Sequence, residues 1–337
     1  MRRNRSSRRA GPALPAVLRT LVVCLIGMTA GGDVAAQNTD LSDECCFSLL
    51  RPTGARAMSL GDAIAARPSP DGLFANPGLL GPISQDEFLI HNANTSVDDS
   101  NTFTLLLATS VGTFALTYRL NDFGETDVTG ENPGQPSIGS IAVLEHTLIA
   151  TYATRIAAGV SAGVSYKLFQ FRLDCRGFCG TEPFAATTHM IDAGAHFRPA
   201  GIPGLELGGS LIHIGFPLQV INEAQGDPAP ARVRVGAAYE VLQHFRPDST
   251  ARLWISMDVE ERLGAPAAPL ASIGLELSLE ETLFLRTGYG GGTGTEGGAG
   301  IGVGLRYDRF DLAVAKSFIS SALDETDPFQ ITFGIRF

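Results

Sequence analysis

The pentapeptide Gly159-Val160-Ser161-Ala162-Gly163 is the feature of this sequence that most suggests covalent chemistry. It matches the G-x-S-x-G elbow of serine hydrolases, in which a sharp strand-to-helix turn exposes the serine hydroxyl to a histidine and to oxyanion donors. Here Ser161 instead lies inside a strand-like segment, in one row with Ser165 and Lys167. We therefore expect Ser161 to be a structural residue of a strand rather than a nucleophile. A histidine within hydrogen-bond reach of Ser161, or a clustered carboxylate pair, at the outer rim would favour the alternative, a lipase or protease.

Cysteine and histidine positions give little sign of a metal centre. Cys175 and Cys179 flank three residues of a glycine-containing loop, and we expect them to form a disulfide because no second Cys or His pair stands at ligand spacing. Cys45 and Cys46 are adjacent, and their pairing stays open. We expect no metal ion and no cofactor. The histidines are scattered, without the pairing of a metal site or triad: His91, His146, His189, His196, His213 and His244.

The run Gly292-Thr293-Gly294-Thr295-Glu296-Gly297 matches the dinucleotide-binding pattern G-x-G-x-x-G. That pattern binds a pyrophosphate only where it joins a strand to a helix in a βαβ unit, and no such unit surrounds it here. We interpret the run as a flexible loop.

The first residues predict a secretory signal peptide over residues 1–36. Six arginines precede an apolar stretch from Leu21 to Met28, and small residues then lead to a cleavage site before Gln37. The apolar stretch is too short to span a bilayer. A lipobox ending at Cys24 is disfavoured because Val23 is too large, and a twin-arginine signal is disfavoured because no apolar motif follows the arginine pair.

The charge of the chain disfavours nucleic acid as a partner. Removal of residues 1–36 takes six of the 25 basic residues and one of the 35 acidic residues, so the net charge falls from −10 to −15. Only two lysines remain, Lys167 and Lys316. A polyanion would be repelled by such a surface.

The elements that must position these side chains show a two-residue period, which indicates β-strands. In the last segment Phe329, Ile331, Phe333, Ile335 and Phe337 alternate with Gln330, Thr332, Gly334 and Arg336. One face suits lipid and the other suits water. Fourteen such segments are expected, near residues 85–92, 101–109, 112–120, 146–156, 158–172, 186–198, 204–214, 231–241, 250–259, 269–279, 281–289, 298–307, 309–317 and 329–337.

The links between the segments alternate between short and long, as in an outer-membrane barrel with tight periplasmic turns and loose outer loops. The link over residues 121–145 is the largest. Both chain ends are then expected at the periplasmic end. Closure of the sheet removes the unpaired edge that hydrocarbon cannot solvate. The fold class predicted is all-β, a transmembrane antiparallel barrel of about 14 strands.

The polar face of the segments carries too many charges for the core of a secreted β-sandwich, because buried unpaired charges are strongly destabilising. We expect these side chains to face the lumen instead. They are Arg155, Lys167, Glu206, Arg232, Arg234, Asp258, Glu276, Arg286, Arg306 and Arg336. Gly300, Gly302 and Gly304 fall on the same face, as though something in the lumen crowds them.

Residues 37–84 do not show strand alternation. The run G-A-R-A-M-S-L-G-D-A, from Gly54 to Ala63, and the later N-P-G-L, from Asn76 to Leu79, resemble the start of the PorV/PorQ group within the FadL-like outer-membrane proteins. The run from Gly300 to Ala315 looks like the penultimate hairpin of that group. The sequence departs from the pattern at Pro77-Gly78 and in the proline-rich spacer 67–72.

The resemblance implies an N-terminal plug over residues 37–84 inside a barrel over residues 85–337. A plain periplasmic tail is the alternative. The resemblance further implies passage of hydrophobic molecules or service in type IX protein secretion, in the bacterial outer membrane. A structural or adhesive protein is a further alternative. Terminal Phe337 resembles the residue read by the barrel assembly machinery. The plug residues expected are Gly54, Ala55, Arg56, Met58, Gly61, Asp62, Asn76 and Pro77.

Overall fold

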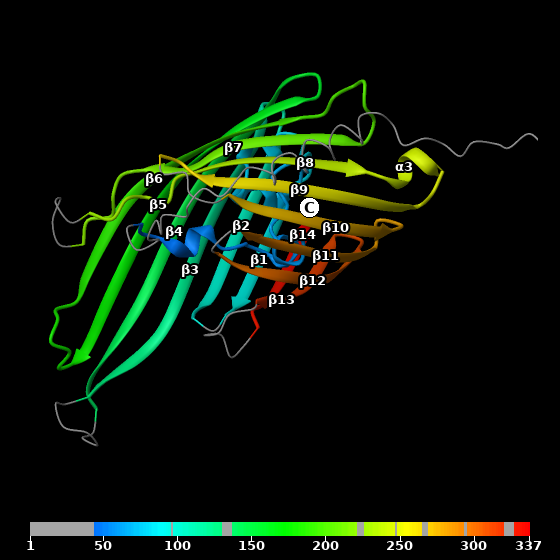
Figure 1. The fold of residues 1–337 in the computed structure, drawn as a ribbon. Coiled ribbons are helices and arrows are strands. Elements are labelled where there is room, and N and C mark those ends of the chain that lie inside the picture. The colour runs from blue at the N-terminus through cyan, green and yellow to red at the C-terminus, as the bar shows by residue number, and fades with distance from the viewer. Residues whose placement is uncertain are drawn as a thin grey trace, which may run out of the picture. The chain divides into compact units, whose positions relative to one another are not determined.

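The computed structural model describes residues 44–95, 97–129, 137–220, 226–246, 248–264, 269–292, 295–319 and 327–337. Over these residues the chain forms a closed antiparallel barrel of fourteen strands (Figure 1). Each strand pairs with its sequence neighbours, and pairing of Glu87 with Arg336 helps to join the first strand to the last. The predicted all-β barrel is confirmed. In the described part of the chain no helix is long and apolar enough to cross a lipid bilayer.

Apart from β3, β4 and β5, which are longer, the strands follow the predicted segments closely, and the short helical elements precede the barrel or cap a turn. The helical elements are η2 (Phe47–Leu50), α2 (Ala55–Ser59), η3 (Pro70–Phe74), η4 (Pro77–Leu80) and α3 (Leu242–Phe245). The strands are β1 (Glu87–Asn94), β2 (Asp99–Thr109), β3 (Gly112–Thr129), β4 (Ser137–Ala157), β5 (Val160–Gly177), β6 (Phe184–Phe197), β7 (Leu205–Gly215), β8 (Arg232–Glu240), β9 (Ala251–Arg262), β10 (Leu270–Leu279), β11 (Leu283–Gly292), β12 (Thr295–Tyr307), β13 (Phe310–Ile319) and β14 (Phe329–Arg336).

The outward face of the barrel is apolar. In β12, for example, Ile301, Val303 and Leu305 all point outward and are exposed. Tyr118 and Tyr166 lie on the same face, and their hydroxyls bond to His146 and His189 on the neighbouring strands. An apolar belt edged by aromatic side chains is the surface that a barrel presents to lipid.

The two ends of the barrel differ. We call the end with the short connections the turn end and the opposite end the loop end. The C-terminus lies at the turn end, where the backbone N–H of Phe337 donates to the carbonyl of Asp86. Glu44, the first described residue, instead binds Arg232 and Arg262 where β8 begins and β9 ends. That position is at the loop end. The N-terminus of the chain, which was expected at the turn end, lies outside the described residues.

Strands β3, β4 and β5 contain 18, 21 and 18 residues and extend beyond their neighbours (Figure 1). A tilted strand needs only about 9–11 residues to cross a bilayer core. The predicted loop over residues 121–145 is therefore wrong in part, since residues 121–129 and 137–145 are strand. We call the extension, residues 122–129, 137–144 and 171–177, the ribbon.

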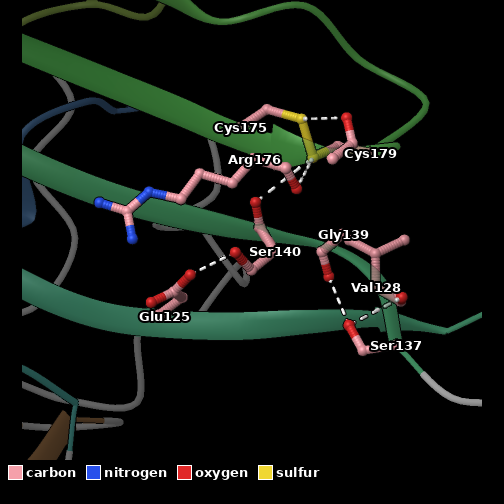
Figure 2. The surroundings of a disulfide bond; sticks show 9 residues. Glu125, Val128, Ser137, Gly139, Ser140, Cys175, Arg176 and Cys179 are labelled. Atoms are coloured by element: carbon pink, nitrogen blue, oxygen red, sulfur yellow. Dashed lines mark hydrogen bonds between the residues drawn. A yellow bond between two sulfur atoms is a disulfide. The ribbon is translucent and has the colours of Figure 1, made fainter.

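Polarity is inverted in the ribbon. Its inward row, which continues the lumen-facing row of the strands, is mostly apolar and half-buried, whereas its outward row is mostly charged. The inward row contains Val128, Ile141, Val143, Phe171 and Leu173, and the outward row contains Glu125, Asp127, Arg172, Asp174 and Arg176. Figure 2 shows the outward Ser140 hydroxyl bonded to Glu125. Charged outward residues are suited to water, so the inversion marks where the wall leaves the apolar belt.

Residues 44–84, which we call the inner segment, lie against the inward faces of strands on both sides of the barrel. Helix α2 contacts β11 to β14, and η4 contacts β4 to β7. The approach is very close at Gly208, where an added β-carbon would lie 1.9 Å from the carbonyl oxygen of Ala65. The wall therefore requires glycine where the backbone of the inner segment touches it.

Candidate functional site

The inner segment leaves a cavity of about 260 Å³ toward the loop end, which we call the loop-side cavity. It lies between η2, the start of α2 and the inward faces of the surrounding strands. Its lining surface is mostly apolar, although many polar residues surround it. The apolar residues that line it are Leu50, Pro52, Met58, Ala93, Leu270 and Pro328. Such a cavity inside a barrel is the kind of space in which an apolar small molecule binds.

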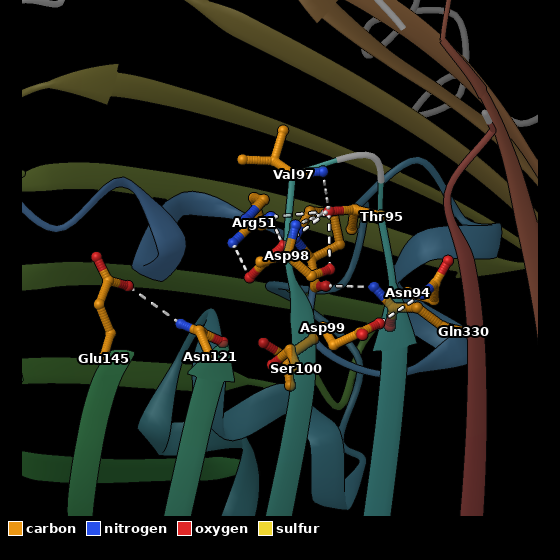
Figure 3. A network of polar contacts seen from close by, with 12 residues as sticks. Arg51, Asn94, Thr95, Val97, Asp98, Asp99, Ser100, Asn121, Glu145 and Gln330 are labelled. Atoms are coloured by element: carbon orange, nitrogen blue, oxygen red, sulfur yellow. Dashed lines mark hydrogen bonds and ion pairs between the residues drawn. The ribbon is translucent and has the colours of Figure 1, made fainter. Parts of the chain in front are cut away.

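One wall of the loop-side cavity carries a paired charge. Arg51, which follows η2, donates from Nη2 to Asp98 Oδ2 at 2.5 Å, and Thr95 Oγ1 donates to Asp98 Oδ1 at 2.7 Å (Figure 3). The Asp98 side chain is fully buried. Because each carboxylate oxygen has a donor, the wall carries little unpaired charge.

A second ion cluster lies across the same cavity. Arg234 on β8 contacts Asp62 at 2.9 Å, Asp258 at 3.0 Å and Glu260 at 3.5 Å. The backbone N–H groups of Ile64 and Ala65 each donate to Asp258 Oδ2 at 2.8 Å. Burial raises the pKa of the Asp62 carboxyl more than the Arg234 guanidinium lowers it. The cluster thus ties the inner segment to β8 and β9.

A second cavity of about 370 Å³ lies toward the turn end, and we call it the turn-side cavity. Glu276 on β10 is its central acid: Arg286 Nε donates to it at 2.7 Å, Arg56 Nε donates at 3.3 Å, and Arg67 also donates to it. Burial lowers the pKa of the Arg67 guanidinium. For Arg56 burial also lowers the pKa, but Asp71 and Glu276 together raise it further, so the net change is upward.

The Asn76-Pro77-Gly78 turn fixes the inner segment to the opposite wall. Asn76 is fully buried, and its side-chain Nδ2 donates to the carbonyls of Ala65 and Ala195, each at 2.9 Å. Its Oδ1 accepts from the N–H of Gly78 at 3.0 Å. The Asn76 side chain therefore caps the η4 turn, links it to Ala65 within the inner segment and joins it to β6.

Ser161 meets a histidine, contrary to the expected scatter of the histidines. Ser161 Oγ lies 3.4 Å from His196 Nδ1, and His196 Nε2 is hydrogen bonded to Glu206. Arg198 Nε donates to the other oxygen of Glu206 at 2.8 Å. The register pairs Ser161 directly with His196 across β5 and β6, which sequence spacing alone does not show.

This Ser-His-Glu arrangement lacks access for a substrate. Ser161 is 1% exposed, and its hydroxyl donates to the carbonyl of Gly78 at 2.8 Å rather than to the histidine. A β-carbon at Gly81 would lie 2.5 Å from Ser161 Cβ, so the inner segment covers the serine. A nucleophile needs room for the carbonyl that it attacks. The geometry fits an anchor for the η4 turn.

Lys167 forms a further buried cluster. Its Nζ lies 2.6 Å from Asp192 Oδ2 and 2.9 Å from His213 Nδ1. The backbone N–H of His213 donates to Asp192 Oδ1 at 2.8 Å, at a residue with φ of 58° beside a register shift between β6 and β7. His213 is thus buried in the lumen and contacts Lys167. The sequence spacing had suggested only another isolated histidine.

The other charged residues expected in the lumen fall into three groups. Arg286, Arg306 and Arg336 line the turn-side cavity. Arg155 is exposed at the turn end, where its Nη2 donates to the carbonyl of Pro82 at 2.8 Å. The remaining members are buried within the barrel: Lys167, Glu206, Arg232, Arg234, Asp258 and Glu276.

Sequence reasoning missed several buried polar residues that position the inner segment. Glu44 binds Arg232 through both carboxylate oxygens, at 2.9 and 2.7 Å. Arg119 donates to Thr53 at 3.2 Å. Arg119 lies on an inward row and Glu44 lies in the inner segment. A charge in either place was the sequence signal that could have marked them, but their partners depend on the three-dimensional packing.

Both cysteine pairs form disulfides. Cys175 joins Cys179 at the end of β5 (Figure 2), and Cys45 joins its neighbour Cys46. Among the residues that the structure describes, no group of three or more His, Cys, Asp or Glu side chains is arranged to hold a metal ion. The candidate site therefore consists of the two cavities and the ion clusters around them.

No family profile and no curated protein sequence matches this chain. Solved structures do match. The Ralstonia pickettii toluene transporter TbuX is 12% identical with a TM-score of 0.56, covering 84% of this chain and 97% of its own. The Pseudomonas putida toluene transporter TodX is 12% identical with a TM-score of 0.57, covering 84% and 96%. A Pseudomonas aeruginosa FadL homologue is 10% identical with a TM-score of 0.50, covering 85% and 98%.

These similarities concern the fold, because the sequences are only about a tenth identical. The FadL-like part of the sequence resemblance agrees with them. The narrower resemblance to the PorV/PorQ group has no counterpart among these neighbours.

Proposed function

We propose that the protein is a non-enzymatic channel of the bacterial outer membrane that admits small hydrophobic molecules, with the inner segment as its plug. The observation that carries this proposal is the loop-side cavity, which is mostly apolar although charged residues surround it. Arg51 forms an ion pair with Asp98, and Arg234 forms ion pairs with Asp62 and Asp258. The charge is thereby kept within the wall, and apolar surface faces the cavity.

The size of the loop-side cavity supports a cargo of one aromatic ring. A cavity of about 150 Å³ in a protein interior binds benzene, and the loop-side cavity measures about 260 Å³. The neighbours TbuX and TodX are described as toluene transporters. Toluene is therefore the first cargo to test.

The ribbon supports an entry route from outside. Its inward apolar row passes Leu173 and Phe171 and reaches Phe169, which is buried with Met190 and Cys45 inside the loop end of the barrel. An apolar molecule that leaves the lipopolysaccharide layer would meet the half-buried apolar side chains of this row. Such surface favours the molecule over water by about 25 cal/mol per Å² buried.

Blocking the loop-side cavity tests the proposal. The chain would be expressed in a Gram-negative host without its own channel of this type, and uptake of labelled toluene by intact cells would be measured. Ser272→Trp places an indole in the cavity, whereas Ile273→Trp places the same group on the outward face. We expect Ser272→Trp to reduce uptake to the host background and Ile273→Trp to leave it unchanged. Equal uptake by both variants would contradict the proposal.

The ribbon favours one second candidate, a role in type IX secretion, because a charged surface outside the apolar belt can bind a partner protein. Glu125, Asp174 and Arg176 belong to that surface. Deletion of the gene separates the candidates: loss of toluene uptake with normal surface secretion supports the channel, and loss of secretion with normal uptake supports the accessory role.

A further inference from the structure

The loop-side and turn-side cavities lie one behind the other along the barrel axis, and His91 is the one described residue that lines both. Along β1 the turn-side cavity is lined by Glu87 and Leu89, and the loop-side cavity by Ala93. His91 lies between these residues in the same inward row. The partition between the cavities therefore includes the His91 ring.

The rest of the partition near α2 is sealed by backbone. A β-carbon at Gly300 would lie 2.2 Å from the carbonyl oxygen of Met58, and one at Gly302 would lie 2.6 Å from Ser59 Cβ. Helix α2 is thus pressed directly on β12. Interiors packed this closely do not open without movement of the chain.

The His91 side of the partition consists of side chains. His91 is 2% exposed, and its Nδ1 lies 2.9 Å from Thr332 Oγ1, which also accepts from the N–H of Ala55 at 2.8 Å. The Phe74 ring lies edge-to-face with the imidazole, with the ring centroids 6.1 Å apart, and a β-carbon at Gly54 would lie 2.9 Å from Nδ1. His91 Nε2 has no hydrogen-bond partner among the described residues. Rotation of the ring thus breaks one hydrogen bond.

We propose that the His91 side chain is the gate between the two cavities, and that its rotation opens a path through the barrel while the inner segment stays in place. This inference rests on the proposed channel function. It adds that the plug need not leave the lumen for a small molecule to pass. An imidazole-sized opening then limits the width of the cargo.

Conductance of the purified protein in a planar lipid bilayer, with potassium chloride as the permeant salt, tests the gate. His91→Ala removes the ring and joins the cavities, so we expect a several-fold rise in conductance. His91→Phe restores the volume without the hydrogen bond, and we expect conductance near that of the unaltered protein. Heat-dependent gel mobility checks that each variant is folded.

The matched control is Thr102→Ala. Thr102 pairs with His91 across β1 and β2, is 1% exposed and lines only the loop-side cavity. We expect no rise in conductance for this variant. The gate is overturned if His91→Ala conducts no more than Thr102→Ala, or if His91→Phe conducts as His91→Ala does. The gate is measured by salt conductance and the proposed function by toluene uptake. The gate can therefore be confirmed where toluene uptake fails, and it can be overturned where toluene uptake is found.

Discussion

At the scale of single residues, ion pairs and hydrogen bonds compensate many of the charges that are buried in the lumen. Glu276 forms ion pairs with three arginines. Asp258 forms an ion pair with Arg234 and accepts hydrogen bonds from two backbone N–H groups. Breaking such a pair on one side leaves an uncompensated charge, which costs more than the pair contributed.

The two lysines of the chain, Lys167 and Lys316, offer a matched test of this point. Lys167→Met leaves Asp192 buried without its cation, and we expect a loss of about 3–5 kcal/mol in the free energy of unfolding. Lys316 lies 47% exposed beside Asp327, so Lys316→Met should cost at most about 1 kcal/mol. Urea unfolding in lipid vesicles, followed by tryptophan fluorescence, measures both. Equal losses would show that Asp192 is not buried in the lumen.

The sequence predicted which way these residues face but not which residues they meet. Alternation predicted Lys167 and Ser161 on one inward row, and both side chains are buried. The contacts of Ser161 with His196 and of Lys167 with His213 join residues 35 and 46 positions apart. Such contacts depend on strand register, and a register is fixed only when the strands pair.

At the scale of elements, alternation predicted strands where one face is clearly apolar. β10 was predicted over residues 269–279 and is found over Leu270–Leu279. The ribbon was missed because its polarity is inverted. In β3 a bulge between Asp122 and Glu125 moves the following residues to the opposite face, whereas in β4 and β5 the register is unbroken there and the inward residues themselves become apolar.

The contact between the inner segment and the wall can be tested by one added methyl group. Gly208→Ala places a β-carbon 1.9 Å from the Ala65 carbonyl oxygen, and we expect a loss of about 1–3 kcal/mol, together with faster proteolysis of residues 60–70. Gly209→Ala is the control, because its nearest neighbour is 3.9 Å away, and a change within about 0.5 kcal/mol is expected. Similar losses for the two variants would contradict the close contact.

At the scale of the whole molecule, the outward belt and the closed sheet depend on each other. Pairing of β1 with β14 leaves no free edge, so the backbone can sit in hydrocarbon, and the outward apolar side chains then gain from contact with lipid. The same alternation in a water-soluble protein would expose that surface to solvent. The outward apolar belt therefore predicts that lipid surrounds the barrel, and a charged side chain placed in the belt can test this.

Val303 lies in the middle of the outward row of β12, and Val111 lies in the turn between β2 and β3. In lipid, an arginine at the middle of the belt costs about 2–4 kcal/mol and one near the rim about 0–1 kcal/mol. We therefore expect Val303→Arg to lower the free energy of unfolding in lipid vesicles by several times more than Val111→Arg, as measured by reversible denaturant titration. In a water-soluble barrel both arginines would be solvated and their effects would be equally small. A small, equal effect of the two substitutions would thus show that hydrocarbon does not surround the belt, and the channel function would lose its physical basis.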